Sequence, residues 1–316
     1  MTEASKASVP PLLPGATAVL TSWNRREIVR ANLLSLRAQT VKFHKIVVVD
    51  NHSTDGTAEM LARDFPDVTS IIMPHAEYGA CETFNIGFAS VPTEFTAILD
   101  DDIELPPDWL EKLLAKFAAE PPTTAMLSTK VVEPGMPDWL VNSSEVNRER
   151  FMATFRGCGT LARTEVLARA GYYDERLFIY GNERDLASRI LALGFRVKQY
   201  PEVVTFHKTP WGQRKGKRSL YFHTRNFWMY ALKYLPWSVI FGFPFRFLAK
   251  QKHQKKTGEF SADATGTIGA LDNIRATPGG WWIIAKATLA AWTVHFPHCM
   301  RNRQKVNSPD FELPLK

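Results

Sequence analysis

The sequence has few of the features that mark secreted, metal-ribbon or membrane-spanning proteins. It contains 3 cysteines in 316 residues, far apart and without a CxxC pair, which argues against a disulfide framework and a zinc ribbon. The first residues, MTEASKASVPPLLPG, lack the apolar stretch of a signal peptide. No long uninterrupted apolar run occurs, so a simple membrane-spanning helix is not expected. Internal repeats and low-complexity segments are also absent.

The composition is that of a folded protein with a basic surplus. Hydrophobic residues make up 45% and charged residues 22%, which excludes wholesale disorder. At roughly 150 residues per domain, the length fits two domains or one large domain with an appendage. Lys and Arg exceed Asp and Glu by 39 − 32 = 7, which favours a partner that carries phosphates or an anionic surface.

Residues 16–132 alternate between short apolar runs and longer amphipathic ones. Strands are expected at 16–23, 45–50, 68–73, 95–100 and 124–132, with helices between them at 26–39, 57–65, 81–90 and 108–120. This alternation predicts βαβ units and a mostly parallel sheet. Ligands bind such sheets at the carboxyl ends of the strands, so the residues after each strand are the first candidates for a site.

Polar side chains follow three of these expected strands. They lie in the segments 21–25 (TSWNR), 50–56 (DNHSTDG) and 100–102 (DDD). Strand ends and helix caps are commonly polar. On a doubly wound sheet, however, these three turns would converge on one edge, and their convergence favours a ligand site.

Three consecutive carboxylates close the fourth strand, in LDDDIELPPDWL (99–110). Carboxylates at the end of a buried strand are costly unless a cation neutralises them. A divalent cation such as Mg²⁺ or Mn²⁺, shared with the phosphates of a ligand, would do so. The alternative is a solvated acidic turn that caps the next helix. His207 ends the apolar stretch VVTFH, and such a histidine, taken alone, is more often structural than a ligand.

Six segments, in this order, resemble the inverting glycosyltransferase family 2. They are VLTSWNR, IVVVDNHSTDGT, LDDDIELPPDWL, FRGCGTLARTEVLARAGYYDE, YGNERDLASR and VVTFHK, and the resemblance covers about residues 14–210. It implies an α/β fold of the GT-A type, a Rossmann-like domain that binds nucleotide sugars. We therefore expect a disordered N-terminus at 1–13, a catalytic domain at 14–210 and a C-terminal helical region at 211–316.

The resemblance also implies a nucleotide-sugar donor site and a divalent metal, Mg²⁺ or Mn²⁺. The residues expected to bind the donor are Thr21, Trp23, Arg25, Asp50, Asn51, Asn85, Asp100 and Asp101. Ser53 and Asp55 are expected to shape the second turn. The segment before Asn85, YGACE, departs from the family's glycine-rich version. Asp102 is expected to ligate the metal and His207 to complete its site. The resemblance therefore favours a metal-ligand role for His207 over the structural role suggested by the residue alone.

Inversion by direct displacement requires a carboxylate that removes the proton of the acceptor hydroxyl. The segment GNERDLASR (181–189) begins a helix and offers Glu183 and Asp185. By the family's pattern Glu183 is expected to be the base, and Asp185 to orient it or to bind the acceptor; Asn182 stands where an acid is common. The alternative for both is an acid favoured by the helix dipole. Residues 157–159 (GCG) are expected to line the acceptor side.

The composition changes beyond His207. Residues 208–258 contain twelve Lys or Arg and no Asp or Glu, and residues 221–247 contain eleven aromatic residues. An anionic membrane surface is the favoured partner. Plain packing or an oligomer contact is the second interpretation, and nucleic acid the least favoured. The basic segment 211–218 is expected to be either a loop that closes over the diphosphate or a solvated linker.

The predicted function is a metal-dependent, inverting transfer of a sugar from a nucleoside diphosphate to a hydroxyl of a glycan or lipid-linked glycan. The protein is expected in the cytoplasm, at the inner face of the cell membrane. Two alternatives stay open. A sugar nucleotidyltransferase is disfavoured because TSWNRRE lacks the glycines of a phosphate loop. A catalytically weak binding partner is disfavoured because the aspartates and the acid at the helix start are both present.

Overall fold

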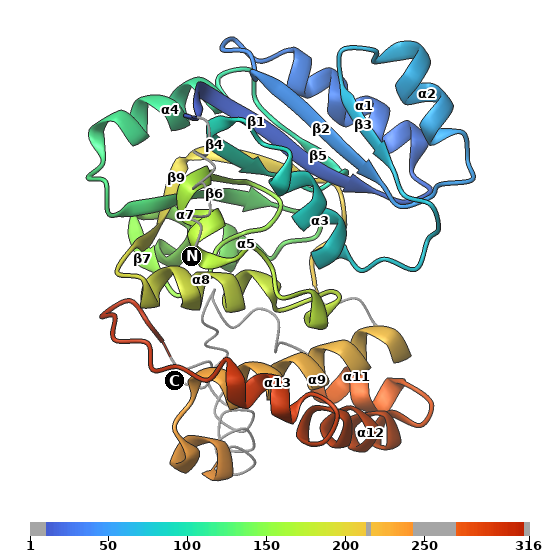
Figure 1. Cartoon of the computed structure of the whole chain (residues 1–316), viewed down its shortest axis with the longest axis vertical. Helices are drawn as coiled ribbons and strands as arrows, with labels where there is room; N and C mark the ends of the chain where they lie inside the picture. Colours follow the sequence, from blue (N-terminus) through green and yellow to red (C-terminus); the bar gives the residue numbers. More distant parts are fainter. Residues whose placement is uncertain (1–10, 213–215, 243–269, 313–316) are drawn as a thin grey trace, which may run out of the picture.

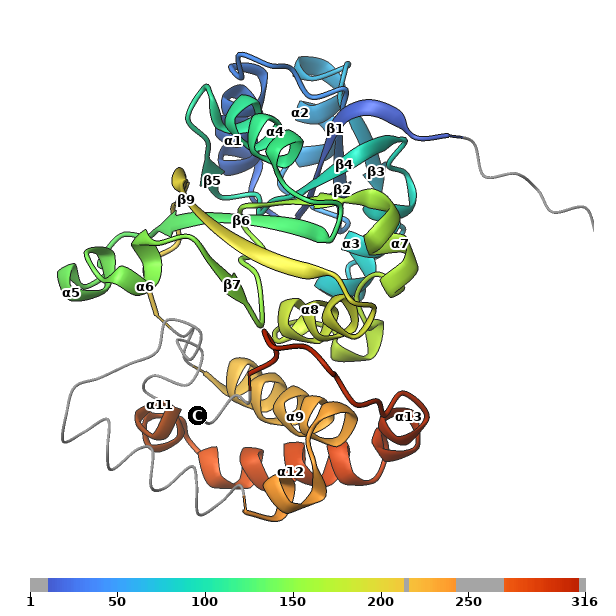
Figure 2. The same cartoon turned by 90° about the vertical axis from the view of Figure 1, so that its left-hand side faces the viewer.

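The computed structural model describes residues 11–212, 216–242 and 270–312. A mixed sheet with helices on both faces forms the larger part, and the C-terminal helices lie together on one side of it (Figures 1 and 2). Residues 1–10, most of the segment expected to be disordered, lie outside the described residues, and the first strand begins at Leu13. The α/β fold class and the C-terminal helical part are confirmed.

The sheet has the strand order β3-β2-β1-β4-β8-β6-β9-β5, and β7 pairs with β9. The bounds are β1 Leu13–Ser22, β2 Lys45–Asp50, β3 Thr69–Ile72, β4 Thr93–Ile98, β5 Ile103–Glu104, β6 Thr124–Val132, β7 Arg150–Met152, β8 Thr160–Arg163 and β9 Arg196–His207. The half formed by β3, β2, β1 and β4 is parallel, as expected. β8 runs antiparallel between β4 and β6, a reversal that the apolar pattern did not predict.

The four helices expected between the strands of residues 16–132 are present, as α1 Arg26–Arg37, α2 Thr57–Asp64, α3 Ala80–Ala89 and α4 Trp109–Ala119. The described residues also form α5 Asp138–Val141, α6 Ser144–Asn147, α7 Thr164–Ala170, the 3-10 turn η1 Glu175–Leu177, α8 Asn182–Ala192, α9 Lys217–Tyr234, α11 Ala270–Ala276, α12 Gly280–Trp292 and α13 Phe296–Arg301. None of the helices in the described ranges is both long and apolar enough for a membrane crossing.

Two apolar cores lie on opposite faces of the sheet, because successive side chains of a strand point to opposite faces. In β2, Val47 and Val49 join the core under α3, α7 and α8, whereas Val48 joins the core under α1, α2 and α4. The first core continues into the C-terminal helices through Met229 of α9 and Cys299 of α13. The expected division at residue 210 stays a prediction, and α9 shares a core with the residues before it.

Helix α9 lies between α8 and α12 (Figure 2), and a buried ion network joins it to α8. Lys233 of α9 is 2% exposed and contacts the carboxylates of Asp174 and Asp185. Asp185, itself 1% exposed, also accepts hydrogen bonds from Arg189 (2.9 Å) and the hydroxyl of Tyr234 (3.0 Å). Burial alone would lower the pKa of Lys233, but the two carboxylates outweigh it and raise this pKa, so Lys233 is charged.

We predict that Lys233→Met lowers the free energy of unfolding by about 3–5 kcal/mol, because it removes the buried ammonium that the carboxylates of Asp174 and Asp185 share, and so leaves excess negative charge in the interior. Urea denaturation measures the change. The matched control is Lys112→Met, which removes an exposed lysine paired with Asp108 on α4 and is expected to cost at most about 1 kcal/mol. Equal effects of the two substitutions would contradict the structural role of Lys233.

Candidate active site at the carboxyl ends of the strands

The aspartate turn after β4 meets the end of β9 through a short antiparallel pairing. Ile103 of β5 is the register partner of His207. The imidazole Nε2 of His207 therefore lies 3.0 Å from Asp102 Oδ1 and 3.6 Å from Asp100 Oδ2. Thr209 donates a further hydrogen bond to the other oxygen of Asp102. The pairing of β5 with β9 thus brings together residues that are far apart in sequence.

The donor set of this cluster fits a divalent cation. One ligand atom each from Asp100, Asp102 and His207 lies within 4.8 Å of the others. Carboxylate oxygens and an imidazole nitrogen are ligands that Mg²⁺ and Mn²⁺ accept. The second ring nitrogen of His207, Nδ1, lies 2.7 Å from Glu133 Oε1. Such an outer carboxylate fixes the orientation of a ligating histidine.

The protonation of the cluster shows strong mutual coupling. Burial raises the pKa of Asp101 to about 7, although Arg25 opposes it. Burial would also raise the pKa of Asp102, but hydrogen bonds from His207 and Thr209 outweigh it and hold this pKa well below its usual range. For His207, burial would lower the pKa, yet the bonds to Asp102 and Glu133 raise it to about 10. Asp102 and His207 therefore stabilise each other's charged forms.

The loop after β1 reaches the same cluster. Arg25 Nη1 lies 2.8 Å from Asp101 Oδ1 and 3.0 Å from Asp102 Oδ2. Thr21 is in register with Val49 of β2, and Trp23 at the start of the loop is 51% exposed. The ends of the first and fourth strands therefore meet, as the parallel arrangement predicts.

The turn after β2 is fixed from within and from the loop after β1. Asp50 is fully buried and accepts bonds from the amide (2.9 Å) and hydroxyl of Ser53. Asp55 accepts from the amide of Arg26 at 2.9 Å, so both acids shape the turn. Asn51 donates to the carbonyl of Tyr78 at 3.1 Å, and its buried Oδ1 has no partner among the described residues.

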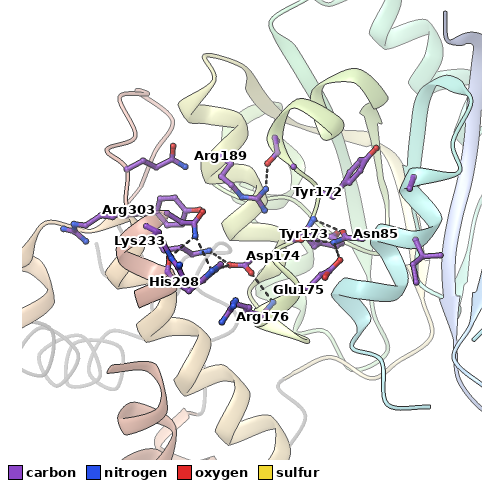
Figure 3. A pocket seen from close by; sticks show the side chains of 18 residues that line it. Asn85, Tyr172, Tyr173, Asp174, Glu175, Arg176, Arg189, Lys233, His298 and Arg303 are labelled. Carbon is purple, nitrogen blue, oxygen red and sulfur yellow. Dashed lines mark hydrogen bonds and ion pairs between the residues drawn. The ribbon is translucent and has the colours of Figure 1, made fainter. Parts of the chain in front are cut away.

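Asn85 has a different environment from the other expected donor residues. Its amide oxygen accepts from the backbone of Tyr173 (2.9 Å), and its amide nitrogen donates to the carbonyl of Tyr173 (2.9 Å) and to Glu175 (3.0 Å). Figure 3 shows Asn85 facing the loop after α7 in a separate pocket. The side chain is fully used in fixing this loop, so the structure gives no support for donor contact.

Glu183 enters the site from the first turn of α8. Gly157 leaves room for it, because a Cβ at residue 157 would lie only 2.7 Å from Glu183 Oε1. Burial raises the pKa of Glu183, with Arg156 opposing. The charge of Glu183 in turn helps to raise the pKa of Asp100. Glu183 therefore lies close enough to the aspartate turn to affect its protonation, and the raised pKa makes Glu183 a stronger base than an ordinary glutamate.

Asp185 lies on the other side of α8. Its carboxylate is 1% exposed and is used by Lys233, Arg189 and Tyr234. These contacts suit a residue that supports α8, and the burial excludes direct contact with an acceptor in this arrangement.

Two residues that sequence reasoning did not assign hold the loop before Glu183. Asn226 of α9 donates to the carbonyls of Leu177, Ile179 and Tyr180 at 2.9, 2.7 and 2.8 Å. Arg225 donates to the carbonyls of residues 176 and 177, at 2.8 Å each. We call this pair the α9 clamp. The sequence signal was an Arg-Asn pair within an aromatic helix, which does not disclose its partners.

The clamped loop has an unfavourable backbone. Phe178 has φ 64° and ψ −56°, and Tyr180 has φ 70°, a region that non-glycine residues rarely adopt. Phe178 stacks on Phe222 of α9, and Tyr180 stacks on His223. The C-terminal helix thus maintains the strained segment that leads directly into Glu183.

The sheet, the acidic turn and the acid at the start of α8 define a glycosyltransferase with the GT-A fold. Solved structures share it: S. aureus TarS 1-349 aligns with 90% of this chain and 92% of its own at a TM-score of 0.55 and 14% identity. The mannosyltransferase PcManGT from Pyrobaculum calidifontis, in complex with GDP-Man and Mn²⁺, aligns with 91% of this chain and 83% of its own. The TM-score is 0.53 and the sequence identity is 19%. At these identities the likeness establishes the fold alone.

The family follows from the sequence match. The model described as "Glycosyl transferase family 2" matches residues 17–175, and the chain belongs to this family. A pre-mycofactocin glycosyltransferase of Mycobacterium tuberculosis (strain ATCC 25618 / H37Rv) is 25% identical over 215 residues, 63% of this chain and 44% of the relative. A chondroitin synthase of Escherichia coli is 23% identical over 246 residues, 64% of this chain and 36% of the relative. The chain spans less than half of each.

We predict that Asn226→Ala lowers the rate of sugar transfer and the free energy of unfolding, the latter by about 1–3 kcal/mol, because it orphans buried carbonyls. Rate and urea denaturation are measured on the same preparation. Asn302→Ala, which removes an exposed asparagine of the C-terminal segment, serves as the control and should change neither. A wild-type rate in folded Asn226→Ala protein would show that the α9 clamp does not position Glu183.

Proposed function

We propose that this chain is a metal-dependent, inverting glycosyltransferase. It would transfer a sugar from a nucleoside diphosphate to a hydroxyl of a glycan or lipid-linked glycan. The observation that carries the proposal is the geometry of the cluster of Asp100, Asp102 and His207, together with the buried Glu183 carboxylate beside Gly157. Solved structures with the same fold support it, since one is a complex with GDP-Man and Mn²⁺ and another is a complex with UDP-GlcNAc.

In this proposal the donor lies across the carboxyl ends of β1, β2 and β4. Thr21, Trp23 and Asn51 would lie around the nucleoside, and the buried Asp50, whose carboxylate holds Ser53, would support this turn from within. Arg25 faces the diphosphate and keeps the charge of the aspartate turn in balance. Asp100 and Asp101 lie on the side of the ribose and the sugar.

Asp102 and His207 would hold the divalent cation. When bound, the cation neutralises the charge that develops on the leaving diphosphate. Glu133 keeps the His207 ring oriented for this task, and Thr209 does the same for the carboxylate of Asp102.

Glu183 is the proposed general base. Its carboxylate accepts the proton of the acceptor hydroxyl while the hydroxyl oxygen forms a bond to the anomeric carbon of the sugar. The bond between this carbon and the diphosphate oxygen breaks, and its electron pair leaves with the diphosphate. The configuration inverts because the acceptor attacks from the face opposite the diphosphate. The raised pKa of Glu183 favours the proton transfer.

We predict that one nucleoside diphosphate or nucleotide sugar raises the melting temperature of the protein, because a ligand that binds only the native state stabilises it. The rise should require Mn²⁺ or Mg²⁺, since the proposed cation joins the diphosphate to Asp102 and His207. Asp102→Ala should abolish this shift. Glu183→Gln should retain the shift and reduce transfer on the order of 10²–10⁴-fold. Thermal unfolding across a nucleotide panel and a product assay measure the two effects.

The pH profile of the same reaction tests the base. Transfer should fall as the pH drops through the pKa of Glu183, since the protonated carboxyl accepts no proton, and this limb should lie above the usual range of glutamate. Glu165→Gln, an exposed position on α7, should leave the rate and its profile unchanged. A ligand shift with no transfer by the wild type would instead support a binding partner without catalysis.

The proposal includes a peripheral position on an anionic membrane, at its cytoplasmic face. Trp281 and Trp282 of α12 are 65% and 74% exposed, and Phe241 is 69% exposed. Lys286 and Arg275 lie exposed on the same helical region. Exposed tryptophans beside cations suit the headgroup level of a bilayer.

We predict that the protein co-sediments with vesicles that contain phosphatidylglycerol, and that Trp281→Ala with Trp282→Ala weakens this binding severalfold. Trp139→Ala, an exposed tryptophan of α5, is the control and should not affect binding. If the protein does not bind vesicles but forms concentration-dependent oligomers, and the same double substitution dissociates them, this face is an oligomer contact instead.

A further inference from the structure

A second pocket lies away from the aspartate turn, at the junction of the sheet domain with the C-terminal helices. Its volume is about 920 Å³, and side chains from α3, the loop 170–176, α8, the end of α9 and the segment 298–304 line it (Figure 3). None of the cluster residues Asp100, Asp102, Glu183 and His207 lines it. It is therefore separate from the proposed donor and acceptor sites.

The two acids that line this pocket are already satisfied by neighbouring groups. Asp174 contacts Lys233 Nζ at 2.9 Å and His298 Nε2 at 2.7 Å, and Figure 3 shows these side chains converging on it. Glu175 Oε1 accepts a hydrogen bond from Asn85 at 3.0 Å. Asp174 is therefore neutralised by its neighbours, whereas Glu175 keeps its negative charge because its partner Asn85 is neutral.

Cationic groups exceed acids among the lining residues. The permanently charged side chains are Arg176, Arg189, Lys233, Arg301 and Arg303, against Asp174 and Glu175. Arg189 pairs with Asp185, and Arg303 donates to the carbonyls of residues 232 and 235. Arg176 and Arg301 are exposed, and among the described residues no carboxylate lies within ion-pair distance of either. Two guanidinium groups thus remain available for an anion.

The size and walls of the pocket indicate an organic ligand rather than a bare ion. Its volume falls within the range of small-molecule sites. The half-buried ring of Tyr172 forms part of the wall, on a backbone with φ 56°, a strained value for tyrosine. Guanidinium groups recognise phosphate oxygens in pairs, and an aromatic face can pack against a sugar or base ring.

We propose that this pocket binds a phosphate-bearing small molecule, with Arg176 and Arg301 as the groups that contact the phosphate. Soluble sugar phosphates and phospholipid headgroups present the same chemistry. Either ligand would bridge the loop 170–176 and α13, and so would join the sheet domain to its C-terminal helices. The proposal does not rest on the assignment of the donor site.

Isothermal titration of the Asp102→Ala protein in EDTA tests the pocket while the metal-dependent donor site is disabled. The probes are inorganic diphosphate and α-D-glucose 1-phosphate. Combined Arg176→Ala and Arg301→Ala should weaken binding about a hundredfold, since each of the two charge-assisted hydrogen bonds contributes about one order of magnitude. Lys305→Ala, an exposed cation of the same segment that does not line the pocket, is the matched control and should stay within about twofold.

A second arm distinguishes the sources of the phosphate. Flotation compares phosphatidylcholine vesicles with and without phosphatidylglycerol. If the protein binds the soluble probes and the arginine substitutions remove this binding, the ligand is a soluble phosphate. If the protein binds only the vesicles that contain phosphatidylglycerol and the same variant loses this binding, the ligand is a lipid headgroup. The absence of binding in both arms overturns the proposal, and so does equal binding by the arginine variant and Lys305→Ala. Unchanged melting temperatures verify that both variants are folded.

Discussion

The contacts of α9 with the loop before α8 set the geometry of the segment that leads into Glu183. That loop carries Phe178 and Tyr180 in a backbone region that costs about 1–3 kcal/mol for each such residue. Asn226 and Arg225 satisfy its carbonyls, and Lys233 ties the same helix to Asp174 and Asp185. The position of Glu183 in the first turn of α8 is therefore set by residues that follow the family match at 17–175.

The site itself is organised by crowded negative charge. Asp100, Asp101 and Asp102 close one strand, and Arg25 and His207 are the cations that approach them. This arrangement raises the pKa of Asp101 and lowers that of Asp102. Such opposed shifts between neighbours are typical of functional sites rather than of solvated turns. The acidic turn is thus buried and coupled, in contrast to the solvated cap considered as its alternative.

Much of the fold could be read from local pattern. The runs 45–50 and 124–132 coincide with β2 and β6, because their apolar content and flanking turns leave no helical alternative. The antiparallel direction of β8 could not be predicted in this way. The sequence of a four-residue strand does not indicate whether it pairs parallel or antiparallel, and its pairing with β4 and β6 depends on the whole sheet. Asn85 shows the same limit at the site: its motif suggested a donor contact, but its amide partners are decided by the loop at 173–175.

The sequence by itself determined the parallel half of the sheet, the convergence of three polar turns and the family, since each depends on local spacing and residue type. The contacts that distinguish the two acids of α8 come from the tertiary structure: Glu183 lies against Gly157, whereas Asp185, two residues on, is buried against Lys233. The tertiary structure also decided that α9 belongs to the site and that a cationic pocket forms beside α13. The physical reason is that these features arise from contacts between distant segments, whose partners no local pattern specifies.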